Sequence, residues 1–223
     1  MKLTILGSGT SQGIPVIACP CAVCHSEDRH DRRLRSSALL EVGGKRIVID
    51  AGPDFRYQML RSGVEDVRAI LLTHGHKDHV GGLDDVRAFN WVKQGAVDVY
   101  GNEGAKEAVY NDFSYAFAEC RYPGVPEIRY HLLDGKPFYV DDIRVVPLPV
   151  MHYKMPVLGF RVGNFAYITD AKTVSDETVG RMQGVGYLVV NALRKESHLS
   201  HFNLAEALAF IDRVKPKRAW LTH

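Results

Sequence analysis

Apolar and polar positions follow two different periods along the chain, and the changes of period mark the expected elements. Residues 2–10, KLTILGSGT, are an apolar run closed by a Gly-Ser-Gly turn, which predicts a first strand. Residues 36–52, SSALLEVGGKRIVIDAG, hold two apolar runs joined at Gly43-Gly44, the pattern of a β-hairpin. Residues 67–74, VRAILLTH, are largely aliphatic, which is typical of a strand buried on both faces.

Helical spacing predominates in several later segments. Residues 54–63, 81–94 and 103–117 are expected to be helices, with a strand at 97–101 between the last two. A connection rich in proline and glycine follows at residues 118–128. Further strands are expected within residues 138–152, 158–170, 186–193 and 218–223.

The last helix begins at NLAE, where Asn203 can cap and Glu206 can hydrogen-bond back, as in a capping box. Its expected apolar face consists of Leu204, Leu208, Ile211 and Val214. The order of strands, helices, strands, helix and strand, with hairpins in both halves, predicts an α/β chain with two packed sheets covered by helices. No linker interrupts the pattern, so residues 1–223 are expected to form one domain.

Composition narrows the class of protein. Hydrophobic residues make up 46% and charged residues 24%, and the net charge of +2 argues against a general nucleic-acid or membrane-surface binder. No apolar run reaches the roughly 18 residues of a membrane helix, and Gly7 and Gly9 interrupt the N-terminal run too early for a signal peptide. Three of the four cysteines crowd into CPCAVC, which is typical of a metal clip in a reducing compartment, so a cytoplasmic location is expected.

The strongest chemical signal is THGHKDH, residues 73–79, at the end of a predicted buried strand. Imidazole nitrogens and carboxylate oxygens are ligands of zinc and related divalent metals. His74 and His76 are two residues apart and can face the same way, whereas Asp78 and His79 are neighbours and point differently. Four ligands in two directions indicate two metals roughly 3.5–4 Å apart, as in hydrolytic two-metal sites.

Three more residues of ligand type end apolar strands: His152 after VVPLPVM, Asp170 after FAYIT, and His223 after RAWLT. Each alone would be interpreted as a surface or capping residue, but together with the loop they favour a binuclear centre. THGHKDH matches the H-x-H-x-D-H signature of the metallo-β-lactamase superfamily, and the three strand-end residues fall in the order of its remaining ligands. The chain resembles that superfamily over nearly its whole length.

This resemblance implies an αββα four-layer sandwich, in agreement with the order of the elements. It also implies two metal sites and one bridge: His74, His76 and His152 for the first metal, Asp78, His79 and His223 for the second, and Asp170 between them beside a hydroxide. IVIDAG resembles the strand-end aspartate motif, in which Asp50 would steady the ligand loop by hydrogen bonds. The alternative is that Asp50 is a turn residue before Gly52.

Cys19, Cys21 and Cys24 need one more ligand to complete a tetrahedral structural zinc site; the alternative is a group of free buried or reactive cysteines. With the turn GSGTSQGIP, this cluster resembles the phosphoribosyl cyclic phosphodiesterases of phosphonate breakdown. In that family the fourth ligand is a histidine three residues beyond the last active-site histidine. That position lies past His223, so the chain is expected to lack its native C-terminal end.

The resemblance implies a hydrolase that uses two divalent metals, zinc or manganese, and a bridging hydroxide to cleave a small anionic cyclic phosphodiester such as a ribose cyclic phosphate. Asp78 is expected to be catalytic as a ligand. His201 lies where the family places a non-ligand histidine that would protonate the leaving alkoxide or bind a phosphate oxygen. His198 is the competing candidate, and an exposed loop histidine is the alternative. Four basic loop residues could attract the anion: Lys154, Lys172, Arg194 and Lys195.

Other functions use similar residues. A lactam or thioester hydrolase has the same ligands, and a nuclease that processes tRNA 3' ends would need an RNA-gripping arm that neither charge nor composition supports. A carrier resembling the protein of pyrroloquinoline quinone synthesis shares the cysteine clip but often lacks the full ligand set. The complete set here favours an enzyme. No stable nucleic-acid or membrane partner is expected, and a homodimer is expected because symmetric dimers are the commonest assembly.

Overall fold

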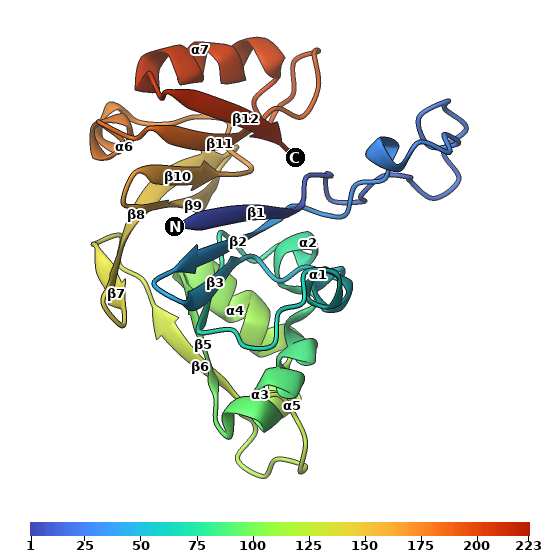
Figure 1. Ribbon diagram of the computed structural model, residues 1–223, viewed down its shortest axis with the longest axis vertical. Helices are drawn as coiled ribbons and strands as arrows, with labels where there is room; N and C mark the ends of the chain where they lie inside the picture. Colours follow the sequence, from blue (N-terminus) through green and yellow to red (C-terminus); the bar gives the residue numbers. More distant parts are fainter. The chain divides into compact units, whose positions relative to one another are not determined.

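The computed structural model describes all residues from 1 to 223, and they divide into two compact units. The first unit is Met1–Leu133 and the second is Asp134–His223. Each unit is built around one six-stranded sheet (Figure 1). No helix in the chain combines the length and the apolarity that a membrane span requires.

The strands of the first sheet lie side by side in the order in which they occur in the chain. They are β1 (Lys2–Gly7), β2 (Ser37–Val42), β3 (Lys45–Ile49), β4 (Ala69–Leu71), β5 (Val97–Gly101) and β6 (Ile128–Leu132). The first three pair antiparallel, and the expected β2–β3 hairpin turns at Gly43 and Gly44, both with positive φ. β4, β5 and β6 each run parallel to the preceding strand. The carboxyl ends of β3, β4 and β5 therefore share one edge of the sheet.

Helices cover one face of this sheet. They are α1 (Phe55–Arg61), α2 (Lys77–Val80), η2 (Leu83–Val86), α3 (Arg87–Lys93), α4 (Glu103–Asp112) and α5 (Ser114–Phe117). Phe55 and Val109 from the helices and Val48 and Ile70 from the strands belong to one buried cluster. The single helix expected at residues 103–117 is broken at Phe113, whose backbone leaves helical geometry and whose side chain is buried in the same cluster.

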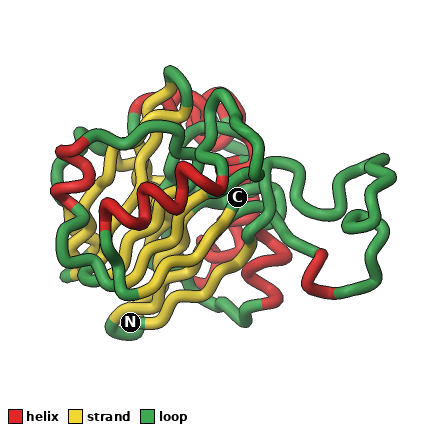
Figure 2. Tube along the Cα trace, turned by 90° about the horizontal axis from the view of Figure 1, so that it is seen from above, coloured by secondary structure: helices red, strands yellow, loops and turns green.

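A long segment, residues 8–36, joins β1 to β2 and is called the N-terminal arm here. Its only helical part is η1 (Arg29–Asp31), and Figure 2 shows the rest as loop extending away from the strands. At its base, Asp54 accepts a hydrogen bond from the backbone N–H of Arg35 at 2.8 Å and another from its guanidinium at 3.0 Å. The arm is therefore anchored to the start of α1 by a charge-assisted pair.

The second sheet has the reverse strand order, from β12 to β7. Its strands are β7 (Phe138–Val140), β8 (Ile143–His152), β9 (Met155–Val162), β10 (Phe165–Ile168), β11 (Tyr187–Asn191) and β12 (Arg218–Thr222). β9 is antiparallel to both β8 and β10, and β11 and β12 are parallel to β10. The carboxyl ends of β8, β10 and β12 therefore lie at one edge.

Two helices complete the second unit, α6 (Asp176–Arg181) and α7 (Leu204–Val214). The predicted capping box at the start of α7 is confirmed. The predicted apolar face is partly wrong: Leu208 is 53% exposed, and the helix instead packs Ala207 and Phe210 into the core cluster of this sheet. Figure 2 shows α7 lying along the strands. The sequence did not predict α6, which buries only Thr178 and so has no apolar period.

Candidate metal centre

The segment THGHKDH follows β4 and leads into α2, and close backbone packing fixes its path. A Cβ on Gly75 would lie 2.7 Å from the Cβ of Ala108 and 2.9 Å from the carbonyl oxygen of Gly104. A Cβ on Gly52 would overlap the carbonyl oxygen of Asp78. Glycine is therefore required at both positions. Gly75 in the loop lies directly against α4, and Gly52, which follows β3, lies directly against the backbone of the loop.

Asp50 lies behind the loop, completely buried, and contacts two of its residues. Its Oδ2 atom is 2.7 Å from Nδ1 of His79, and its Oδ1 atom accepts hydrogen bonds from the backbone N–H and the hydroxyl of Thr73 at 2.8 and 3.1 Å. The Thr73 hydroxyl is also 3.0 Å from Nδ1 of His74. Asp50 thus fixes the ring orientation of His79 directly and reaches His74 through Thr73.

The environment of Asp50 also changes its proton affinity. Burial raises the pKa of its carboxyl group, while the charge and hydrogen bond of His79 and the hydrogen bonds from Thr73 act in the opposite direction. Its backbone has φ = 62°, a left-handed conformation that aspartate adopts more readily than most residues. The positive φ and the two hydrogen-bonded neighbours, His79 and Thr73, therefore both favour aspartate at this position.

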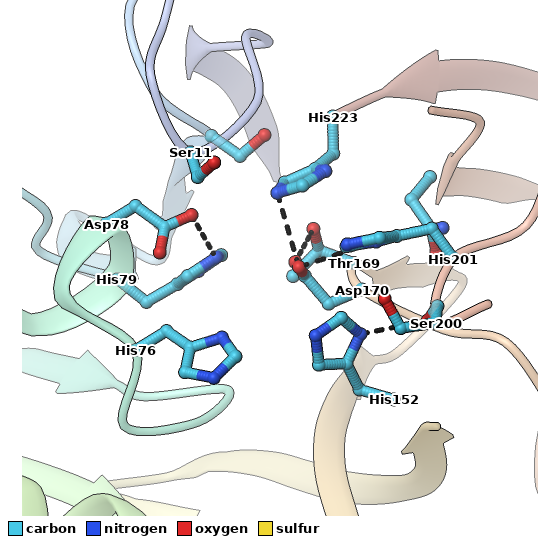
Figure 3. A network of polar contacts seen from close by, with 12 residues as sticks. Ser11, His76, Asp78, His79, His152, Thr169, Asp170, Ser200, His201 and His223 are labelled. Carbon is cyan, nitrogen blue, oxygen red and sulfur yellow. Dashed lines mark hydrogen bonds and ion pairs between the residues drawn. The ribbon is translucent and has the colours of Figure 1, made fainter. Parts of the chain in front are cut away.

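The four ligand candidates of the loop form two pairs. Nε2 of His74 lies 3.1 Å from Nδ1 of His76. Nε2 of His79 lies 3.1 Å from Oδ2 of Asp78 (Figure 3). His74 and His79 are buried, whereas Asp78 is partly exposed and His76 is exposed. Two nitrogens, or a nitrogen and a carboxylate oxygen, that converge in this way suit a shared cation.

The second unit brings its three strand-end candidates to one edge of its sheet. His152 ends β8, while Asp170 and His223 follow β10 and β12. Nε2 of His223 is 3.2 Å from Oδ1 of Asp170 (Figure 3). Nδ1 of His152 is 2.9 Å from the carbonyl oxygen of Ser200, so Nε2 is the nitrogen that a metal would bind. Asp170 and His223 both have positive φ, at 54° and 56°.

His201 is buried among these residues. Its Nδ1 atom is 3.6 Å from Oδ1 of Asp170, and its ring stacks on that of His223 with centroids 4.9 Å apart (Figure 3). Burial lowers the pKa of His201 to about 4, against the charge of Asp170, which acts to raise it. His152, Asp170 and His201 each offer a ligand atom within 4.8 Å of the others, so His201 has the position of a further ligand.

His198, the competing candidate, does not belong to the group formed by His152, Asp170 and His201. Its ring centroid is 5.1 Å from that of His201, and its Nδ1 atom accepts a hydrogen bond from the backbone N–H of Ser200 at 3.3 Å. Two of the basic residues expected to attract an anion have internal partners. Lys172 pairs with Glu206 at 2.7 Å, and the Arg194 guanidinium donates to the carbonyl oxygen of Ser197.

Sequence reasoning missed the threonines that precede three of the ligand candidates. They are Thr73 before His74, Thr169 before Asp170 and Thr222 before His223, and all three are buried. The Thr169 hydroxyl donates to Oδ2 of Asp170 at 2.6 Å, as the Thr73 hydroxyl does to Asp50. The signal was present in the sequence as a repeated Thr-ligand step at strand ends, LLTH, YITD and WLTH.

The three clustered cysteines meet in the N-terminal arm. Cys19, Cys21 and Cys24 each place a sulfur within 4.8 Å of the others, and all are free thiols. The backbone N–H of Cys24 donates to the Cys21 sulfur at 3.4 Å, and this hydrogen bond is the main reason why the pKa of Cys21 is lowered. A lowered thiol pKa favours the thiolate, the form that binds zinc. Cys120 is exposed and lies outside the cluster.

The donor atoms fit divalent cations. Each unit supplies histidine nitrogens and at least one carboxylate, and neighbouring groups orient these ligand candidates: Asp50 and Thr73 in the first unit, Thr169 and the carbonyl of Ser200 in the second. Such outer hydrogen bonds are typical of metal-ligating histidines and carboxylates. The arm adds three sulfurs, a set that suits a structural zinc ion with one more ligand.

Comparison with curated sequences relates the chain to known proteins. The model of the "Beta-lactamase superfamily domain" matches residues 45–223. The chain is 40% identical over its whole length to an octanoyltransferase of Porphyromonas gingivalis, but it spans only 46% of that protein. It is also 28% identical, over 74% of its length, to a ribonuclease Z of Mycobacterium sp. strain KMS, and covers 65% of that enzyme.

Solved structures agree with this placement. A diphosphatase from the PhnP family superposes with a TM-score of 0.92 and 37% identity, covering 99% of this chain and 85% of the other. Zinc-bound PqqB from Methylobacterium extorquens shares the fold, with a TM-score of 0.79, 20% identity and coverage of 100% and 89%. The expected α/β class of the metallo-β-lactamase type is confirmed. On the match of the family model, the chain belongs to the β-lactamase superfamily.

Proposed function

We propose that this chain is a phosphohydrolase in which two divalent metals act together on a small cyclic phosphodiester, such as a ribose cyclic phosphate. The observation that carries the proposal is the division of the ligand loop into two pairs, His74 with His76 and Asp78 with His79, each with facing atoms 3.1 Å apart. One metal would need only one such pair. Two pairs in seven residues support one cation for each.

The proposed ligand sets are those that the family signature implies. One metal would take His74, His76 and His152, the other Asp78, His79 and His223, and Asp170 would serve both. When bound, the metals would lower the pKa of a bound water and neutralise phosphoryl oxygens. The protein's own part is orientation: Asp50 holds His79, Ser200 holds His152, and Thr169 holds Asp170. His201, 3.6 Å from Asp170, would contact a phosphate oxygen or the leaving alkoxide.

The substrate class rests on the 37% identity to a diphosphatase of the PhnP family. Hydrolysis of a diphosphate and of a phosphodiester both begin with attack on phosphorus and stabilise the same kind of developing charge. We also propose zinc or manganese as the active-site metals, a structural zinc in the arm, a cytoplasmic location consistent with its free thiols, and a homodimer.

The test is hydrolysis of bis(p-nitrophenyl) phosphate by protein stripped of metal and then reloaded with zinc or manganese. We expect turnover only after reloading, and we expect Asp78→Ala to abolish it while binding one metal fewer. Asp66→Ala, which changes an exposed aspartate of the same unit, is the matched control and should keep full activity. Full activity in Asp78→Ala would refute the two-metal assignment.

A second candidate is thioester hydrolysis, because the chain matches an octanoyltransferase over its whole length at 40% identity. The metal ligands of the two reactions are the same, so the substrate has to decide. The reloaded protein should be assayed in parallel with an octanoyl thioester. Turnover of the thioester without turnover of the phosphodiester would transfer the proposal to this second class.

A further inference from the structure

The second unit contains an arginine-lined cavity far along β8 from His152. It has a volume of about 540 Å³ and is lined by Pro137, Arg144, Val146, Arg161, Gly163 and Arg181. Arg144 is the second residue of β8 and His152 is the last. At about 3.3 Å of rise per residue, eight residues of strand separate them by roughly 26 Å, so one small ligand cannot contact both.

Two of the three guanidinium groups are held rigidly by backbone carbonyls. Arg161 donates to the carbonyl oxygens of Gly163 at 3.0 Å, Arg181 at 2.6 Å and Gln183 at 3.0 Å. Arg181 donates to the carbonyl oxygens of Gly135 at 2.7 Å and Pro147 at 3.1 Å. Carbonyl partners are neutral, so they orient these side chains without cancelling their charge.

The positive charge of the cavity is poorly compensated. Glu177 is the one carboxylate that pairs with any of the three arginines, at 2.8 Å from Arg181, and its side chain is 76% exposed. Arg144 is exposed and has no hydrogen-bond or ion-pair partner. Three positive charges therefore face one cavity beside a single carboxylate at its rim, which raises the local concentration of anions.

We infer that this cavity binds a phosphate group, separately from the metal centre. Guanidinium N–H groups are good donors to the oxygens of phosphate, and Nη2 of Arg161 and Nε of Arg181 are not used in the contacts with carbonyls. Two of the three guanidinium groups are already fixed in orientation, so little conformational entropy is lost on binding. Its size lies within the range of cavities that hold small ligands, roughly 300–1,000 Å³. Arg144 would close on the bound anion as the mobile third donor. The inference does not depend on the proposed hydrolysis.

The test is calorimetric titration of the metal-loaded protein with inorganic phosphate at low salt. Arg144→Gln should weaken one phosphate-binding event about tenfold to a hundredfold, because a hydrogen bond to a charged group is lost. Arg218→Gln removes an exposed arginine from β12 of the same sheet and is the matched control, which should bind as the wild type does. Neither change should alter the hydrolysis rate or the unfolding temperature.

Identical isotherms for the wild type and Arg144→Gln would overturn the inference, as would equal losses in Arg144→Gln and Arg218→Gln. Phosphate that binds at the metals should still bind with unchanged affinity in Arg144→Gln, which distinguishes it from phosphate in the cavity. A parallel titration with ribose 5-phosphate shows whether the cavity prefers a sugar phosphate to free inorganic phosphate. Tighter binding than inorganic phosphate would identify a sugar phosphate as the ligand, and equal binding would identify the phosphate group alone.

Discussion

Nδ1 of His79 and Oδ2 of Asp50 lie 2.7 Å apart, with both side chains withdrawn from solvent. Asp50 and His79 are 29 residues apart in the chain, yet this contact decides which nitrogen of His79 faces outward. Nε2 is left beside the Asp78 carboxylate, where a metal would take both. The orientation of a ligand candidate in the loop therefore depends on a residue that is completely buried.

Asp50→Asn should weaken metal binding without removing a ligand. The amide keeps the size of the side chain but loses the charge that holds the Nδ1 proton of His79, and loss of such outer contacts typically reduces metal affinity about 10- to 100-fold. Metal titration with a chromogenic chelator would measure the change. The control Asp66→Asn, on the surface of the same unit, should leave the metal affinity unchanged. An unchanged affinity in Asp50→Asn as well would mean that Asp50 is only a turn residue.

Gly75→Ala should displace the ligand loop. The new methyl group would lie 2.7 Å from the Cβ of Ala108, so the loop or α4 has to move. Overpacking of this kind typically lowers the free energy of unfolding by about 1–3 kcal/mol. Chemical denaturation and metal titration should both show a loss. Gly180→Ala in α6 meets nothing within 4 Å, so it should raise stability by about 0.5–1 kcal/mol.

Asp98 should contribute stability that disappears in acid. Burial acts to raise its pKa, but hydrogen bonds from His131 at 2.8 Å and Arg68 at 3.0 Å, with the charges of Lys93 and Arg129, lower it overall. A carboxyl group with a lowered pKa in the folded state stabilises the protein above its unfolded pKa of about 3.9. This contribution is lost as the pH falls through the lower folded value.

Asp98→Asn should accordingly reduce the free energy of unfolding by about 1–3 kcal/mol at pH 7, with a difference from the wild type that shrinks below about pH 4. Urea unfolding at a series of pH values would measure both. A difference that stayed constant down to pH 3 would mean that packing, and not charge, accounts for the effect.

The cysteine cluster should respond to chelation while Cys120 does not. With zinc bound, a thiol reagent should rapidly modify Cys120 alone among the four free cysteines, because metal-bound thiolates are protected. After chelation all four should react. Rapid reaction of all four in zinc-loaded protein would exclude a structural metal in the arm. Cys21→Ser should mainly lower stability and should leave metal binding by the histidine and aspartate candidates unchanged.

The parts that were predictable from sequence are those governed by local pattern. Two apolar runs and the Gly43-Gly44 turn located the first hairpin, and Asn203 with Glu206 located the start of α7. The face that α7 buries was misjudged because Leu208 and Ala207 are both apolar, and only packing decides that the smaller residue faces the core. A short helix such as α6, with one buried residue, leaves no periodic signal.

In the candidate site, too, the residue types could be predicted from local sequence, but their contacts could not. Histidine and aspartate at strand ends could be identified because their residue types are rare there, but the pairing of His74 with His76 and of Asp78 with His79 depends on backbone geometry after the strand. The threonines were missed because a hydroxyl beside a ligand is unremarkable until its hydrogen bond is seen. The arginine cavity joins residues up to 44 positions apart, since Pro137 and Arg181 both line it.

The strand order has a consequence for how the protein is made. In both sheets each strand pairs only with strands adjacent to it in sequence, so no strand has to wait for a distant partner. A growing chain can complete the first sheet once β6 has left the ribosome, before any strand of the second has been synthesised. The loop that carries His74, His76, Asp78 and His79 would then be folded, with Asp50 already in contact, while the second unit is still being translated. Biosynthesis would thus fold the two units one after the other.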